Sequence, residues 1–286
     1  MDDSLTRTFR RLRDRLVSRF FDTRYGRDLL IRNIGARTRF LTVDNGDHLI
    51  TFSPADYLGR SVFVKGHFDR DHVDRLMQHL NMLGLSVRGK TLLEIGGNIG
   101  THTIYFALTG AFDRIVTVEP DPRNFELLRE NSEQNGFDKL VVSVNCAASD
   151  EEGEIDFFLH PNNHGKSSPR SRSAADIRIA VPARPVPAIL ADAGIPEADV
   201  GLIWMDIEGY EPIACRSMTS LFERRVPMHC EFTAEFYGAE KAAEFVAFLA
   251  GYYETCIVFF NDDSMERMKV VDIPLNREQF DILLIA

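Results

Sequence analysis

The stretch from Thr91 to Gly100, TLLEIGGNIG, constrains the fold of this chain more than any other. Thr91–Ile95 is a short apolar run, glycines follow at positions 96, 97 and 100, and apolar residues at helical spacing continue to Leu108. This order predicts a strand, a glycine turn and a helix that starts at about Asn98. Because glycine has no Cβ, such a turn lets a ligand approach the backbone, and the free N–H groups of the helix start point toward that ligand.

The spacing of the glycines distinguishes two kinds of ligand. A dinucleotide-binding turn has the pattern G-x-G-x-x-G, which from Gly96 would require glycine where the chain has Asn98 and Thr101. The pattern present is E-x-G-x-x-x-G, with Glu94 two residues before Gly96. A carboxylate at this strand end repels a pyrophosphate and attracts a ligand that carries an amino group and a sulfonium, such as S-adenosylmethionine.

These residues resemble motif I of class I methyltransferases. The version Glu94-Ile-Gly-Gly-Asn-Ile-Gly100, together with Asp206-Ile-Glu-Gly-Tyr-Glu211, is similar to the FkbM family over about residues 60–286. The resemblance implies an α/β fold with a Rossmann-like, seven-stranded sheet whose last strand is antiparallel. It also implies an S-adenosylmethionine-dependent methyltransferase that acts on a hydroxyl of a small molecule, sugar, glycan or secondary metabolite.

The residues expected to bind the donor lie at the carboxyl ends of the predicted strands. The second strand, Arg114–Glu119, ends on an acid, which in a βαβ unit accepts hydrogen bonds from ribose hydroxyls. In the methyltransferases that the chain resembles, the loop after the third strand closes on adenine, and small residues there leave room for a flat ring. The expected set is Glu94, Gly96, Asn98, Gly100, Glu119, Pro120, Ala147, Ala148 and Asp206.

Further acids follow the next two strands. Gly201–Asp206 is a near-continuous apolar run, as in a buried parallel strand, and residues 226–232 form the next predicted strand, with Glu231 near its end. Transfer of a methyl group to a hydroxyl is helped by a general base within hydrogen-bond reach. We therefore expect Asp206 and Glu231 to face one cavity and one of them to act as this base; the alternative is a structural hydrogen bond for each.

His164 is a third catalytic candidate, in the polar stretch 160–173. This stretch is predicted to be either a flexible loop or a lid over the acceptor, since loops beside a rigid site often carry specificity. His164 is then either a base or a solvated loop residue, and His229 is assigned to a strand interior. A divalent cation held by Asp206 and Glu231 is a competing interpretation, because magnesium prefers oxygen ligands; no clear third ligand is present, so we assign no metal-binding residue.

Residues 1–85 are predicted to form a helix and a small β and helical cover, and residues 86–286 the donor-binding domain. Apolar residues at spacings of three and four predict a helix over 4–21 with arginines on its other side. Such a helix either caps the domain or contacts an anionic membrane surface. Asn45-Gly46 between apolar runs predicts a hairpin, and residues 69–84 are predicted to be helical. The apolar side of the first helix consists of Leu5, Phe9, Leu12, Leu16 and Phe20.

Charge and cysteine content limit the partners. The chain has a formal charge of −10, and because residues 1–40 carry eleven arginines against five aspartates, the remainder has a charge of −16. An acidic body argues against nucleic acid as a substrate. The four cysteines are far apart and no apolar core of a signal peptide precedes them, so we expect a cytoplasmic protein with reduced thiols. N-methyl transfer, or a regulatory subunit that binds the donor without turnover, are the alternatives, and the oligomeric state stays open.

Overall fold

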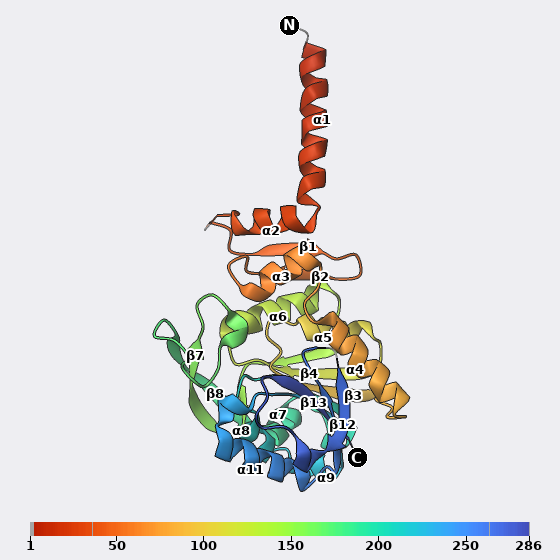
Figure 1. The fold of residues 1–286 in the computed structure, drawn as a ribbon, viewed down its shortest axis with the longest axis vertical. Helices are drawn as coiled ribbons and strands as arrows, with labels where there is room; N and C mark the ends of the chain where they lie inside the picture. The colour runs from red at the N-terminus through yellow and green to blue at the C-terminus, as the bar shows by residue number, and fades with distance from the viewer. Residues whose placement is uncertain (1–2, 36, 263, 286) are drawn as a thin grey trace. The chain divides into compact units, whose positions relative to one another are not determined.

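The structure, a computed structural model, describes residues 3–35, 37–262 and 264–285, with side chains from Arg11 onward. The chain divides into two compact units, Met1–Asp69 and Arg70–Ala286 (Figure 1). The predicted boundary, between residues 85 and 86, differs because helix α4 (Arg70–Met82) is counted with the second unit. Its buried face, which includes Val73 and Leu76, joins one apolar cluster with Leu92 and Phe106.

The first unit combines helices with a hairpin. Its elements are α1 (Asp3–Phe21), α2 (Arg24–Arg32), β1 (Leu41–Asp44), β2 (Leu49–Phe52) and α3 (Tyr57–Lys65). The predicted hairpin is confirmed, since β1 and β2 pair antiparallel and Gly46 has a φ of 92° in the turn between them. Helix α3 is not expected from the sequence pattern. It begins after Asp56, whose carboxylate accepts hydrogen bonds from the N–H groups of Leu58 and Gly59, which is a standard N-cap.

The predicted N-terminal helix is confirmed by α1. On its apolar side, Leu12, Leu16 and Phe20 keep 54%, 59% and 41% of their surface exposed, whereas the side chains of Leu5 and Phe9 lie outside the described residues. No helix in the described ranges is both long and apolar enough to cross a bilayer. The described part of the apolar side of α1, from Leu12 to Phe20, is therefore largely exposed.

The second unit is built on a mainly parallel sheet (Figure 1). In spatial order its strands are β12 (Met265–Lys269), β11 (Thr255–Phe259), β13 (Phe280–Ile285), β10 (Met228–Phe232), β9 (Val200–Met205), β3 (Lys90–Ile95), β4 (Phe112–Val118) and β5 (Val141–Val144). The last strand, β13, pairs antiparallel with both β10 and β11, as predicted. Within the described ranges the sheet has eight strands, one more than the predicted seven. The extra strand, β12, has a mostly exposed, polar sequence at the sheet edge, so no apolar run signals it.

Helices cover both faces of this sheet and produce two apolar clusters. One cluster joins the sheet to α7 (Val186–Asp192), α8 (Glu211–Arg216), α9 (Thr219–Glu223) and α11 (Ala239–Ala250). The other joins it to α4 and α5 (Thr101–Leu108). The remaining helices are α6 (Pro122–Gln134) and α10 (Ala234–Tyr237). This is the Rossmann-like class I arrangement that the sequence predicts.

The chain between β5 and β9 forms a second, smaller sheet of three strands. It consists of β6 (Ala147–Ser149), β8 (Ile177–Pro185) and β7 (Gly153–Leu159). The polar stretch 160–173 connects β7 to β8 and contains a short 3-10 turn, η1 (His164–Lys166). The chain around Ala147 is thus a strand and not the loop that we expected, because β6 pairs in parallel with β8.

Candidate functional site

The glycines of the turn Glu94–Gly100, here named the donor turn, are required by packing within the chain. A Cβ on Gly96, which has a φ of 95°, would lie 1.9 Å from the backbone oxygen of Asp206. A Cβ on Gly97 would lie 2.2 Å from Oγ1 of Thr117. The contact at Gly96 is with backbone and excludes a side chain there, whereas a side chain at Gly97 would have to displace the Thr117 and Leu128 side chains. The donor turn therefore packs directly against the end of β9 and the side of β4, in addition to any ligand that approaches it.

The helix after the donor turn starts later than predicted. Gly100, with a φ of 87°, is its N-cap, and α5 begins at Thr101 rather than at about Asn98. Asn98 itself has a φ of 48°, a left-handed conformation that asparagine tolerates better than most residues. Its backbone N–H donates to Oε2 of Glu119 at 2.8 Å, and its buried Oδ1 makes no hydrogen bond in the described part of the chain.

Glu94 is a fully buried carboxyl group, and one of its two oxygens accepts a hydrogen bond within the described residues. Oγ1 of Thr103 donates to its Oε2 at 2.5 Å, but its Oε1 has no hydrogen-bond partner among the described residues. Burial raises the pKa of Glu94 to about 7, against the opposing effects of the Thr103 hydrogen bond and of the nearby Thr117 hydroxyl. Orphaned buried polar atoms are uncommon in native proteins. A cationic ligand group at Oε1 would satisfy this atom and restore the charged form of the carboxylate.

Glu119 joins the donor turn to the start of α6. Its two oxygens accept backbone hydrogen bonds from Asn98 and Asp121, both at 2.8 Å. Desolvation by burial and the neighbouring Asp121 raise the pKa of Glu119 to about 8. Each carboxylate oxygen accepts more than one hydrogen bond, so these contacts leave acceptor capacity for a ligand. Pro120 lies between Glu119 and Asp121, and Asp121 caps α6 by accepting a hydrogen bond from the Arg123 N–H.

The two alanines expected beside adenine are buried in protein. Ala147 is 4% and Ala148 3% exposed, and their side chains belong to two different apolar clusters. Their small size is therefore explained by packing of β6, and contact with adenine stays a prediction. Asn145, just before them, is exposed and donates from its side chain to the Glu119 carbonyl at 2.7 Å. Of these three residues, Asn145 is the one that is exposed and bonded to the backbone of a predicted donor-binding residue, Glu119.

Three carboxyl groups, here named the acid cluster, meet at the carboxyl ends of β9 and β10. The register of these parallel strands pairs Trp204 with His229, so Asp206 and Glu231 stand two residues further on along neighbouring strands. Together with Glu208, these acids place one carboxylate oxygen each within 4.8 Å of the others. The predicted convergence of Asp206 and Glu231 is thus found. His229 is buried and stacks on Trp204 with ring centroids 4.2 Å apart, which agrees with its assignment to a strand interior.

The electrostatics of the acid cluster favour a shared proton. Glu231 is 7% exposed, and burial together with the nearby Asp206 raises its pKa well above the usual range of a carboxyl group. Oγ1 of Thr233 donates to its Oε1 at 3.1 Å. Two carboxylates that share a site cannot both ionise easily. Glu231 therefore keeps a proton at a pH where an exposed glutamate would be charged.

Glu208 is the member of the acid cluster that the sequence analysis did not count as a ligand. It has a φ of 55°, and strained backbone of this kind is concentrated at functional sites. Arg172 forms an ion pair with it at 2.7 Å, and its pKa is raised by burial and by Asp206. Because carboxylate oxygens suit magnesium, these three acids could hold a divalent cation. The positive φ, which aims Glu208 at the other two acids, cannot be read from sequence spacing.

Glu211 closes the segment Asp206–Glu211. Its Oε1 accepts hydrogen bonds from the backbone N–H groups of Ile207 and Gly209, at 3.1 and 3.2 Å. Its Oε2 accepts from the Tyr237 hydroxyl at 3.0 Å. Burial raises the pKa of Glu211 to about 7. This carboxyl group fixes the backbone that carries Asp206 and Glu208, a positioning role that the sequence analysis missed because the acid is simply the last residue of the motif.

The polar stretch 160–173 lies close to the donor turn at one end and is bonded to the acid cluster at the other. A Cβ on Gly165 would lie 3.2 Å from the side-chain amide nitrogen of Asn98, and the Arg172 guanidinium binds Glu208. The backbone of His164 accepts from Asn124 of α6 at 3.5 Å. His164 is not one of the residues that form the acid cluster, so its catalytic role stays a prediction. The stretch spans from the donor turn to the acid cluster, as a lid would.

A family model described as "Methyltransferase FkbM domain" matches residues 94–254. The chain belongs to the FkbM methyltransferase family. It is an S-adenosylmethionine-dependent methyltransferase, and the matched region begins at Glu94 and includes the acid cluster, so the donor turn and the acids belong to one catalytic domain. A comparison with curated proteins finds no match.

Several solved methyltransferase structures are similar to this FkbM-family chain. They include the FkbM methyltransferase of Methylobacillus flagellatus, with 16% identity, 68% of this chain and 43% of that chain covered, and a TM-score of 0.45. An O-methyltransferase from Bacillus cereus in complex with SAH has 12% identity, coverage of 76% and 90%, and a TM-score of 0.41. M. jannaschii TYW2 in complex with AdoMet has 11% identity, coverage of 87% and 86%, and a TM-score of 0.43. This chain thus spans less than half of the length of the Methylobacillus protein.

Proposed function

We propose that this FkbM-family enzyme transfers the methyl group to a hydroxyl of a small-molecule, sugar or glycan acceptor, with the Asp206–Glu231 pair supplying the general base. The observation that carries the proposal is the convergence of these two carboxyl groups from neighbouring strand ends. Burying two acids side by side is costly unless they are paired or hydrogen-bonded. Chemistry that needs a proton acceptor is a reason for a protein to keep such an arrangement.

The donor side of the site suits S-adenosylmethionine, which supplies the methyl group as an electrophile. We expect Oε1 of Glu94, buried and without a partner in the described residues, to accept from the donor's amino group. We expect Glu119 and the backbone around Asn98 to bind the ribose, and Gly96, Gly100 and Pro120 to shape the surface against which the donor lies. These assignments follow from the family and from the positions of the residues at the strand ends.

The acceptor side divides the work between the two acids. The raised pKa of Glu231, caused by burial and by Asp206, favours a proton on Glu231. Asp206, half-buried at the strand end, is then the acid placed to accept the hydroxyl proton as the oxygen attacks the methyl carbon. General-base assistance of this kind contributes about 10²- to 10⁴-fold to a rate. A cation bound by Asp206, Glu208 and Glu231 would take the place of the shared proton, and Asp206 would then be a metal ligand instead of the base.

The proposal is tested with labelled S-adenosylmethionine and a panel of hydroxylated and amino compounds. The expected product is a methyl ether, and Asp206→Asn should lower the turnover number at least about a hundredfold while the dissociation constant of S-adenosylhomocysteine is unchanged. Glu235→Gln, an exposed acid on α10, is the control. Methylation confined to amines, or full turnover in both Asp206→Asn and Glu231→Gln, would show that the proposed chemistry is wrong.

A further inference from the structure

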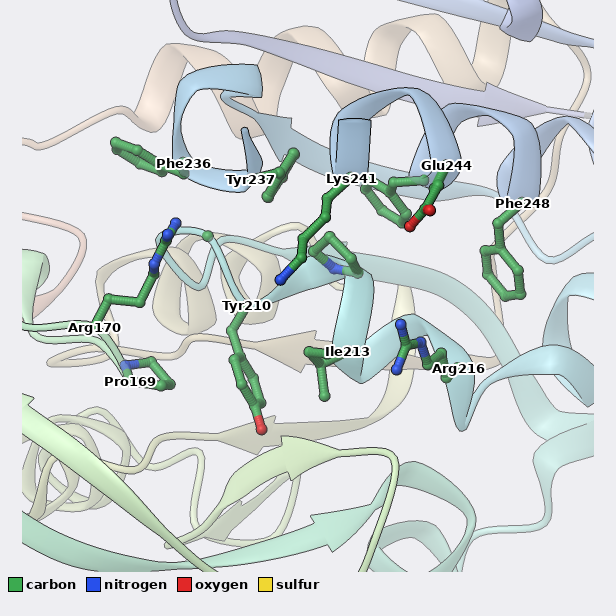
Figure 2. Close-up of a pocket in the computed structure, with 13 residues that line it drawn as sticks. Pro169, Arg170, Tyr210, Ile213, Arg216, Phe236, Tyr237, Lys241, Glu244 and Phe248 are labelled. Atoms are coloured by element: carbon green, nitrogen blue, oxygen red, sulfur yellow. The ribbon is translucent and has the colours of Figure 1, made fainter. Parts of the chain in front are cut away.

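A cavity of about 420 Å³ lies on the α8 and α11 side of the segment Asp206–Glu211 (Figure 2). It is bounded by the Pro169–Arg170 part of the polar stretch, by α8, and by α10 and α11. Its volume falls within the range of small-molecule sites, about 300–1,000 Å³. None of the donor-binding or catalytic residues assigned above lines it, so the cavity is additional to the donor site.

The walls of this cavity are aromatic and held in place. The hydroxyl of Tyr210 lies 3.2 Å from Oγ of Ser149, and the hydroxyl of Tyr237 donates to the buried Glu211. Ile213 and Phe248 complete an apolar lining (Figure 2). Rings fixed at their polar ends present a pre-organised apolar surface, which favours a flat or ring-containing ligand.

The rim of the cavity is cationic, although the chain as a whole has a charge of −10. Arg170, Arg216 and Lys241 line it, with Glu244 as the one acid among the lining residues. Arg216 is engaged by Asp150 at 3.3 Å. No ion pair of Arg170 or Lys241 is found with the other described residues, and Figure 2 shows the Lys241 side chain reaching from α11 into the cavity. Two cationic side chains over an apolar wall complement a doubly charged anionic group.

The cavity and the acid cluster share a wall. Gly209 and Tyr210 line the cavity and belong to the same segment as Asp206 and Glu208. A Cβ on Gly209 would lie 2.9 Å from Cβ of Phe236, so these residues are in close contact. The Arg172 guanidinium lies 4.1 Å from the centre of the Phe236 ring and pairs with Glu208 on its other side. The cavity and the acid cluster therefore lie on two sides of one thin wall, and a ligand that occupies both must pass around Phe236 and Arg172.

We propose that this cavity binds the non-reacting end of the methyl acceptor, and that this end is a phosphate ester attached to a ring-containing body. The phosphate lies between Arg170 and Lys241, and the ring lies on Tyr210 and Ile213. The identity of the ligand as the acceptor rests on the proposed function, whereas the existence of the phosphate site does not. The proposed acceptor is thus a hydroxyl compound that also carries a phosphate ester. An enzyme that adds a phosphate or nucleoside diphosphate group must act before this one to make such an acceptor.

Phenyl phosphate is the probe, with phenol and inorganic phosphate as its neutral and ring-free counterparts, titrated into the full chain and followed by NMR. Phenyl phosphate should bind more tightly than either counterpart. The double variant Arg170→Gln, Lys241→Gln should weaken its binding about tenfold, as expected for two partly exposed ion pairs. Lys269→Gln, an exposed lysine on β12, should leave it unchanged. Because the substituted residues are exposed, the variants are expected to fold, which a thermal unfolding curve verifies.

Two results would overturn the proposal: phenol binding as tightly as phenyl phosphate, or an unchanged dissociation constant of phenyl phosphate in the double variant. A second variant, Ile213→Glu, places an acid in the apolar wall and should abolish phenyl phosphate binding; retention of binding would contradict the assigned location. None of these measurements involves methyl transfer. If the parent protein does not bind phenyl phosphate while Asp206→Asn still lowers turnover, the cavity site alone is rejected. If the parent protein binds phenyl phosphate while Asp206→Asn keeps full turnover, only the proposed base is rejected.

Discussion

The donor turn and the acid cluster both place carboxyl groups at strand ends, but among the described residues three carboxylates come within 4.8 Å of one another only in the acid cluster. On the donor side, Glu94 and Glu119 are each bonded to groups of neighbouring elements, Thr103 for one and two backbone N–H groups for the other. On the acceptor side, Asp206 lies against Glu231, and burial together with Asp206 raises the pKa of Glu231, although the Thr233 hydroxyl also donates to Glu231. A carboxyl group held by donors is suited to binding, whereas acids that crowd together are suited to exchanging a proton.

The largest effect is expected from Gly96→Ala. The new methyl group would lie 1.9 Å from the Asp206 carbonyl oxygen at a φ of 95°, so clash and backbone strain add together. We expect the free energy of unfolding to fall by about 3 kcal/mol or more. Gly136→Ala is the matched control, because Gly136 has a φ of 74° but nothing near its Cβ position; strain alone should cost about 1–2 kcal/mol. Chemical denaturation measures both, and equal losses would show that the donor turn is not packed against β9 as described.

The next largest effect concerns donor binding. Glu119→Ala should weaken S-adenosylhomocysteine binding by about 1.5–3 kcal/mol, the range for hydrogen bonds to a charged group. It also removes the bonds to Asn98 and Asp121, so binding is measured by calorimetry only on a sample whose circular dichroism matches the parent protein. Glu130→Ala on the exposed side of α6 is the control. An unchanged dissociation constant would restrict Glu119 to a structural role.

The pH dependence of stability should distinguish the buried acids from ordinary ones. The pKa values of Glu94 and Glu211, raised to about 7 by burial, exceed the usual value of 4.5, so between these limits the folded state binds more protons than the unfolded state. Stability from these groups is complete below about pH 4.5 and is lost as the pH rises toward 7, by up to about 1.4 kcal/mol per pH unit and group. Glu94→Gln should flatten this decline, and exposed Glu240→Gln should not. A Glu94→Gln curve parallel to the parent curve would contradict the raised pKa.

The smallest expected effect is that of metal removal. If Asp206 and Glu231 share a proton, EDTA should leave methyl transfer unchanged and added magnesium should not increase it. The acid cluster nevertheless brings three carboxylate oxygens within 4.8 Å of one another, so the measurement tests a real alternative. If EDTA abolishes methyl transfer and magnesium restores it, the acid cluster is a metal centre and its acids bind a cation instead of exchanging a proton.

Signals contained in a contiguous stretch were predictable from the sequence. The apolar run before Gly96, the hairpin at Asn45-Gly46 and the N-terminal helix all depend on residues close together in the chain. The meeting of Asp206 with Glu231 was also predictable, because neighbouring parallel strands end at one edge. Glu208 follows Asp206 by two residues, but its approach to Glu231 was not predictable, since it has a backbone φ of 55°.

Elements without an apolar pattern of their own were missed. Strand β12 is polar and exposed, and it forms because β11 offers an unpaired edge. Strand β6 is only Ala147–Ser149 and exists through its pairing with β8, more than thirty residues away. Their formation depends on a distant partner, and spacing within the sequence carries no information about it. The cavity beside α11 was missed for the same reason, because its walls come from segments far apart in the chain.

The contact between Gly96 and the Asp206 carbonyl has a consequence for how this enzyme can change over evolutionary time. The donor turn packs so closely on the backbone of Asp206 that a methyl group on Gly96 would lie 1.9 Å from the Asp206 carbonyl oxygen. A shift of either segment therefore requires a compensating shift of the other. Substitutions that change acceptor preference are therefore expected in the cavity lining, away from the contact between Gly96 and Asp206. We therefore expect directed evolution toward new acceptors to accept substitutions at Arg170, Ile213 and Lys241 and to reject them at Gly96 and at Ile207, whose side chain also faces that contact.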